Sequence, residues 1–197
     1  TEYDCGPTTM MNAIRYLFRR EDIPPDVVKS IMMYTLNAYN TKGESGKNGT
    51  SSMAILFLTN WLNQFGQVKN FPIRCEYITG EAAVITQNSS IADALHQGGA
   101  VVVRLMHGIW HYALLTGIGD GYVELFDPYY RIKPFGDKDI EIIPDQPLKA
   151  NRRVTFGRLN DTGKGYYAMG QIDTREAVIL FNTKTRKTPE RTIEYFI

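Results

Sequence analysis

Apolar residues recur at helical spacing in the first third of the chain. The first predicted helix covers residues 5–19, and its apolar side chains share one face: Met10, Ile14, Leu17 and Phe18. Gly6-Pro7 suits its first turn, because proline is tolerated where backbone N–H groups lack helical partners. Further helices are predicted over 24–39 and from Ser51 or Ser52 to Phe65-Gly66, where the glycine is expected to end the helix. The polar, glycine-rich stretch between them, residues 40–49, is predicted to be a mobile loop.

From residue 71 the pattern changes to that of β-strands. Strands are predicted over 71–79, 100–106, 110–118 and 122–126, and a short helix over 91–97 is capped by Ser89 or Ser90. Gly119-Asp120-Gly121 predicts a tight turn between the last two of these strands. Residues 166–169 and 177–181 also have strand-like composition and are expected to pair around 170–175. Helices first and antiparallel strands afterwards predict an α+β fold with N-terminal helices packed on an antiparallel sheet.

The composition is that of a globular domain of ordinary size. Of the 197 residues, 43% are apolar, and 22 basic against 21 acidic side chains give a net charge of +1. This balance gives no reason to expect a nucleic-acid partner. The sequence contains no run of about 18 apolar residues, so a membrane span is not expected. Residues 1–135 are interpreted as the core, and 136–197 as a strand-containing C-terminal extension of the same domain.

Cys5 and Cys75 are the two cysteines. A disulfide between them stays open, but they are interpreted as one reactive and one buried thiol. Cys5 stands at the predicted start of a helix, where unpaired N–H groups and the helix dipole favour a thiolate. Its own N–H is also free to face a developing oxyanion. The alternative is a small core residue near the end of the chain.

A nucleophilic thiol needs a base, and the candidates are His96, His107 and His111. His96 is expected at a solvated helix end, and His107 in a turn before Gly108. His111 opens an apolar strand, a position from which its side chain can project into a cleft. It is therefore the favoured base, with a structural histidine as the alternative.

The predicted hairpin brings a carboxylate to that base. His111 begins the first strand of the hairpin and Asp127 follows the second, a separation of 16 residues. Asp127 can then accept from the imidazole and fix its tautomer, as the third member of a catalytic triad does. Its alternative role is to end the strand before Pro128. His107 and His111 have the spacing of a zinc ligand pair, but no second cysteine or acidic partner pattern accompanies them. No phosphate-binding glycine loop is recognised either, so no metal and no cofactor are expected.

Several of these segments resemble one family. The run Asp4-Cys5-Gly6-Pro7-Thr8-Thr9 before an apolar helix is similar to the nucleophile segment of the bacteriocin-processing, double-glycine-leader peptidases and their papain-like relatives. Gly49-Thr50-Ser51 before a helix also resembles them, as do the segments 111–118 and 123–128, which are similar to the family's histidine and aspartate hairpin. The resemblance covers roughly residues 4–130. It implies a papain-like fold with catalytic Cys5, His111 and Asp127.

The resemblance also implies a cysteine peptidase that hydrolyses a peptide or isopeptide bond of a peptide or protein substrate through a thioester. Family members usually have a glutamine oxyanion donor six residues before the cysteine, a position that lies before Thr1. The loop 40–50 is expected to border the substrate channel. Two alternatives stay open: a thiol acyltransferase or amidase on a non-protein substrate, and an inactive binding domain of the same fold. Residues 1–4 resemble neither a signal peptide nor an initiation sequence, so the chain is interpreted as trimmed, and a cytoplasmic location is favoured.

Overall fold

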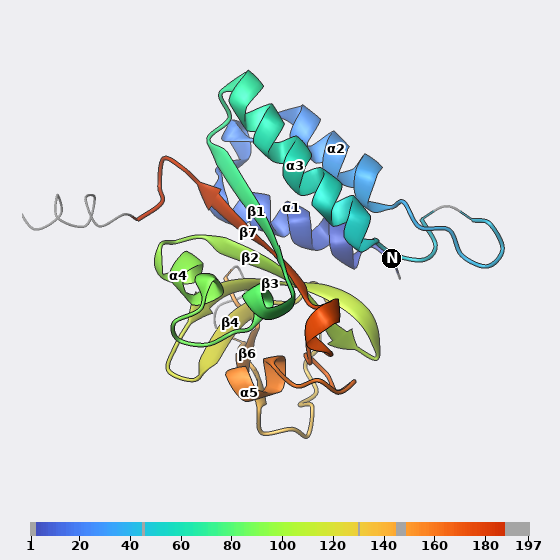
Figure 1. Ribbon diagram of the computed structural model, residues 1–197, viewed down its shortest axis with the longest axis vertical. Coiled ribbons are helices and arrows are strands. Elements are labelled where there is room, and N and C mark those ends of the chain that lie inside the picture. Colours follow the sequence, from blue (N-terminus) through green and yellow to red (C-terminus); the bar gives the residue numbers. More distant parts are fainter. Residues whose placement is uncertain (1–2, 45, 130, 145–148, 188–197) are drawn as a thin grey trace, which may run out of the picture.

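Three helices from the N-terminal part of the chain lie together on one side of an antiparallel β-sheet (Figure 1). The computed structural model describes residues 3–44, 46–129, 131–144 and 149–187. The helices are α1 (Cys5–Leu17), α2 (Pro25–Thr35), α3 (Ser52–Lys69), α4 (Ser90–His96) and α5 (Phe156–Leu159), with short 3-10 turns η1 (Arg20–Asp22), η2 (Gly80–Ala83) and η3 (Ile172–Thr174). The strands are β1 (Ile73–Thr79), β2 (Ala100–His107), β3 (Ile109–Ile118), β4 (Tyr122–Phe126), β5 (Ile140–Ile142), β6 (Arg152–Thr155) and β7 (Glu176–Asn182).

All seven strands of the described residues belong to one sheet, in the order β1-β7-β2-β3-β4-β6-β5. Each neighbouring pair is antiparallel. The predicted α+β class, with N-terminal helices packed on an antiparallel sheet, is confirmed. The hairpin predicted around Gly119–Gly121 is also present, as β3 and β4.

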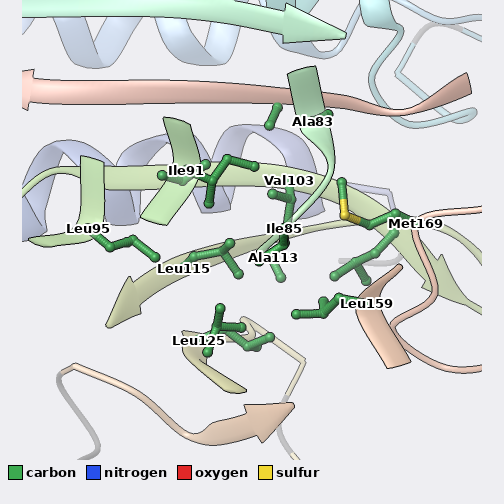
Figure 2. Close-up of a cluster of buried hydrophobic side chains, with 14 of the residues drawn as sticks. Ala83, Ile85, Ile91, Leu95, Val103, Ala113, Leu115, Leu125, Leu159 and Met169 are labelled. Atoms are coloured by element: carbon green, nitrogen blue, oxygen red, sulfur yellow. The ribbon is translucent and has the colours of Figure 1, made fainter. Parts of the chain in front are cut away.

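The two faces of the sheet bury separate hydrophobic cores. One core lies between the sheet and helices α1, α2 and α3, and the other is closed by α4 and α5. Figure 2 shows part of the second core, where Ile91 and Leu95 of α4 pack near Leu115 of β3. Because strand side chains alternate between faces, Val102 lies in the first core while Val103 lies in the second.

Two predicted helix ends were wrong. The third helix does not stop at Gly66. Its last residue is Lys69, and Asn70 caps it with a left-handed φ of 54°. Gly66 instead permits a close approach of the chain that follows, since a Cβ there would lie 2.9 Å from the carbonyl oxygen of Phe71. The second helix ends at Thr35, not near Tyr39.

The expected pairing of 166–169 with 177–181 was also wrong. The later segment is β7, which lies between β1 and β2 in the middle of the sheet. The earlier segment is no strand. It is bound to the end of β2, where the Tyr167 N–H donates to the Met106 carbonyl (2.7 Å) and the Met106 N–H donates to Ala168 (2.8 Å). Strand-like composition indicates a buried extended segment but does not identify its partner.

Residues on both sides of position 135 build this sheet. Strands β5, β6 and β7 come from the segment interpreted as a C-terminal extension, and β7 separates two strands of the proposed core. Within the described residues, no helix combines the length and apolar character needed to cross a bilayer.

Candidate active site

Cys5 is the first residue of α1 and is partly buried. The first N–H groups of a helix have no partner within it, and Pro7 contributes no N–H, so Cys5 and Gly6 supply the free donors of this turn. These donors and the helix dipole favour negative charge on the Cys5 sulfur or on an oxyanion bound beside it.

Thr50 packs against the same turn. A Cβ on Gly6 would lie 2.1 Å from the Thr50 Oγ1, so only glycine permits this contact. Thr50 Oγ1 is buried and has no hydrogen-bond partner among the described residues. Asn37 holds the next residue, because its amide donates to Ser51 Oγ (2.8 Å) and accepts from the Ser51 N–H (3.2 Å). The end of the 40–50 loop therefore lies beside Cys5, as a channel border would, although lining a channel stays a prediction.

His111 and Cys5 are brought together by the packing of α1 on β3. Thr9, one turn after Cys5, donates its hydroxyl to the Tyr112 carbonyl at 2.9 Å in the protein interior. This bond joins the start of the helix to the residue that follows His111. The Cys5 side chain is among the groups that raise the pKa of His111, so the sulfur and the imidazole lie close together in one site.

Asp127 holds the opposite nitrogen of the same ring. His111 Nε2 lies 2.8 Å from Asp127 Oδ1, which leaves Nδ1 for the thiol. The pairing of Leu114 with Phe126 in the β3–β4 hairpin sets this distance. Burial opposes the charged ring, but the hydrogen bond to Asp127 and the nearby Cys5 side chain outweigh it and raise the pKa of His111 to about 9. The imidazolium is therefore the stable form at neutral pH.

The Asp127 carboxylate is fully buried and hydrogen-bonded at both oxygens. Burial alone would raise its pKa, but bonds to His111, the Tyr167 hydroxyl and the Tyr129 N–H lower it below the usual value. Asn151 binds its backbone twice, donating to the Asp127 carbonyl and accepting from its N–H, each at 2.8 Å. The carboxylate is thus ionised and fixed in place.

Tyr167 and Arg152 lie behind Asp127. The Tyr167 hydroxyl donates to Asp127 Oδ2 at 2.6 Å and accepts from Arg152 Nε at 3.2 Å. Burial and the neighbouring carboxylate raise the pKa of Tyr167, so the hydroxyl keeps its proton. Both side chains are almost completely buried.

The other candidates have no bond to the His111–Asp127 pair among the described residues, although one of them, His107, lies beside it. His96 is solvent-exposed at the end of α4, as expected, and Cys75 is a buried free thiol whose pKa is raised by burial. His107 ends β2, and its ring centroid lies 5.3 Å from that of His111. Burial lowers the pKa of His107, which keeps this ring neutral beside the charged one. Three or more His, Cys, Asp or Glu side chains arranged to hold a metal do not occur in the described part of the chain.

Sequence reasoning missed Asn151, Arg152 and Tyr167. Arg152 and Arg153 look like a surface cluster, yet β6 turns Arg152 into the protein. Tyr167 lies in a segment interpreted as a strand, but its φ of 64° is left-handed. The sequence shows only that an asparagine precedes two arginines, and this pattern does not identify their partners. No protein-family model matches the chain, and no curated protein matches its sequence.

Proposed function

We propose that the chain is a papain-like cysteine peptidase domain, similar to the double-glycine-leader peptidases, in which Cys5 is the nucleophile. The observation that carries the proposal is the imidazole of His111, which lies 2.8 Å from the Asp127 carboxylate and close enough to Cys5 for that side chain to raise its pKa. A thiol, an imidazole and an orienting carboxylate in this order are the groups that acyl transfer through a thioester requires.

In the proposed reaction, the Cys5 thiolate attacks the substrate carbonyl carbon and forms a tetrahedral oxyanion. The N–H of Cys5, at the start of α1, is placed to donate to that oxyanion. His111 then gives its proton to the departing amine, and the C–N bond breaks to leave a thioester. Water attacks the thioester while His111 removes its proton, which releases the acid and restores the thiolate–imidazolium pair.

The raised pKa of His111 suits the first half of this cycle. An imidazolium with a pKa of about 9 is protonated at neutral pH, so the proton needed by the leaving amine is in place before attack. Asp127 supports the charged ring and fixes its tautomer.

The test uses the two cysteines as a matched pair. Quenched fluorescent peptides, including some with Gly-Gly before the scissile bond, are incubated with the wild type, Cys5→Ala and Cys75→Ala. We expect Cys5→Ala to abolish cleavage with little change in the urea unfolding midpoint, and Cys75→Ala to retain cleavage while it remains folded. Mass spectrometry after a thiol-directed acyl probe should find the label on Cys5.

Cleavage that survives in Cys5→Ala would overturn the proposal. A labelled Cys5 in a wild type that cleaves no peptide of the library would retain the thiol chemistry but reject a peptide substrate.

A further inference from the structure

We propose that Tyr167 is a positioning residue of this site, and that its hydroxyl, oriented by Arg152, holds the Asp127 carboxylate in the rotation that His111 requires. The inference rests on the thiol–imidazole chemistry proposed above and extends it to the segment after β5.

The two oxygens of Asp127 have separate partners. Oδ1 faces His111 Nε2 and accepts from the Tyr129 N–H, both at 2.8 Å, whereas Oδ2 accepts from the Tyr167 hydroxyl at 2.6 Å. The last side-chain torsion of aspartate is broad, so a carboxylate held on one side only can turn. Tyr167 supplies the second attachment, and a turn away from it would carry Oδ1 off the imidazole.

Arg152 sets the direction of the phenol proton. A guanidinium only donates, so the Tyr167 oxygen must accept from Arg152 Nε, and its one hydrogen is left for Asp127. Arg152 also donates hydrogen bonds to neutral carbonyls, those of Asn151 (2.8 Å) and Tyr129 (3.1 Å). The buried positive charge of Arg152 is thus connected through the Tyr167 hydroxyl to the negative charge of Asp127.

The backbone of Tyr167 is held in a costly conformation. Its φ of 64° is left-handed, which is unfavourable for a bulky side chain. Bonds on both sides maintain it: the Tyr167 N–H donates to Met106 (2.7 Å), and the Met169 N–H donates to Leu159 (2.9 Å). Such conformations persist where the surroundings impose them and concentrate at functional sites.

Tyr77 offers a matched control. Its hydroxyl donates to the Glu176 carboxylate at 2.5 Å, which repeats the chemistry of Tyr167 at a carboxylate that has no imidazole partner. Tyr77→Phe therefore removes the same kind of bond without touching the proposed array.

The experiment compares Tyr167→Phe and Tyr77→Phe in the wild type and in Asp127→Asn. We expect Tyr167→Phe to lower kcat for peptide cleavage about tenfold with little change in KM, the size expected for one hydrogen bond to a charged group. Iodoacetamide labelling of Cys5 at pH 6.5 should slow severalfold. In Asp127→Asn, Tyr167→Phe should cause no further loss, because its effect passes through that carboxylate. Tyr77→Phe should change none of these rates.

The inference would be overturned if Tyr167→Phe lowered kcat by the same factor in the wild type and in Asp127→Asn. Unchanged labelling of Cys5 in a folded Tyr167→Phe would also overturn it. Circular dichroism and urea unfolding establish that each variant is folded. If Tyr167→Phe does not fold, Arg152→Lys, which keeps the phenol, takes its place with the same expectation. Labelling needs no turnover, so a wild type that cleaves no peptide would fail the proposed function while the role of Tyr167 is still decided.

Discussion

Asp127 and Glu176 are two buried carboxylates with closely similar partners. Each accepts a short hydrogen bond from a buried tyrosine, and each has an arginine nearby. Glu176 is bound by Tyr77 and Tyr112, both at 2.5 Å, and lies 3.3 Å from Arg104 Nε. Asp127 differs in that its other oxygen binds an imidazole, together with the Tyr129 N–H.

Because of that imidazole, the Asp127 centre can exchange protons, whereas the Glu176 centre only holds its neighbours in place; we call the Glu176 centre a clamp. Burial raises the pKa of Tyr77 and of Tyr112, so the donors to Glu176 keep their protons at neutral pH. Arg104 extends the same network to Ser52 Oγ (3.0 Å) and the Thr174 carbonyl (2.6 Å), which ties β2 to α3 and η3. At Asp127 the ring of His111 has a pKa of about 9 and also contacts a thiol. A tyrosine and an arginine fix a carboxylate; an imidazole beside it makes proton transfer available.

The largest expected effect comes from neutralising each carboxylate in turn. Asp127→Asn should lower kcat/KM by about 10³-fold, because an amide no longer stabilises the charged imidazole or its tautomer. Glu176→Gln should instead lower the free energy of unfolding by about 3 kcal/mol, since it leaves the Arg104 charge without its buried partner. The measurements are peptide cleavage kinetics and urea unfolding.

The folded fraction of Glu176→Gln should retain activity within about threefold. If the two variants lost activity equally, the distinction between clamp and proton-exchanging site would be broken.

The pH dependence of stability sharpens the same distinction. The pKa of His111 is about 9 in the folded protein and roughly 6.5 in an unfolded chain, so its contribution is complete below pH 6.5 and is lost as the pH rises through 9. Relative to His111→Gln, the wild type should lose up to about 3 kcal/mol of unfolding free energy over this range. Urea unfolding at pH 6, 7.5 and 9.5 measures it.

Glu176→Gln should keep the full pH dependence, because it leaves His111 and its partner Asp127 unchanged. Parallel curves for the wild type and His111→Gln would contradict the assignment.

The smallest effect concerns the bond that links the two centres. Thr9 holds the carbonyl of Tyr112, whose side chain binds Glu176 and whose chain neighbour is His111. Thr9→Val keeps the shape and should cost about 1 kcal/mol of unfolding free energy. Activity should fall about threefold, the amount expected for a slight shift of β3 relative to Cys5. Thr8→Val, at the neighbouring half-buried position, is the control and should change neither quantity.

Local signals in the sequence were sufficient for the contact between His111 and Asp127. Gly119-Asp120-Gly121 fixes a hairpin turn, and the hairpin alone brings the two residues together. Ser51 and Ser89 cap α3 and α4 by accepting the N–H of the residue three positions on, as their spacing predicts. Such signals act over a few residues and are therefore visible in the sequence.

The support behind Asp127 could not be predicted in this way. Tyr167 reaches Asp127 across 40 residues and Asn151 across 24, and no periodic pattern records either contact. The central place of β7 was missed for the same reason. Its apolar sequence indicates a buried strand but does not show which strands lie on either side of it. Long-range partners are chosen by packing in the folded state, which a local pattern does not describe.

The place of β7 has a consequence for the synthesis of the protein. Until Glu176–Asn182 have left the ribosome, β1 and β2 expose unpaired backbone edges where the last described strand will later insert. The helical layer and the first hairpin can form earlier from contacts close in sequence. Tyr167 and Arg152 are translated well after Cys5 and Asp127, so the bonds behind Asp127 form only after this later segment has emerged. Termination before β7 would therefore leave an incomplete sheet that is prone to aggregation.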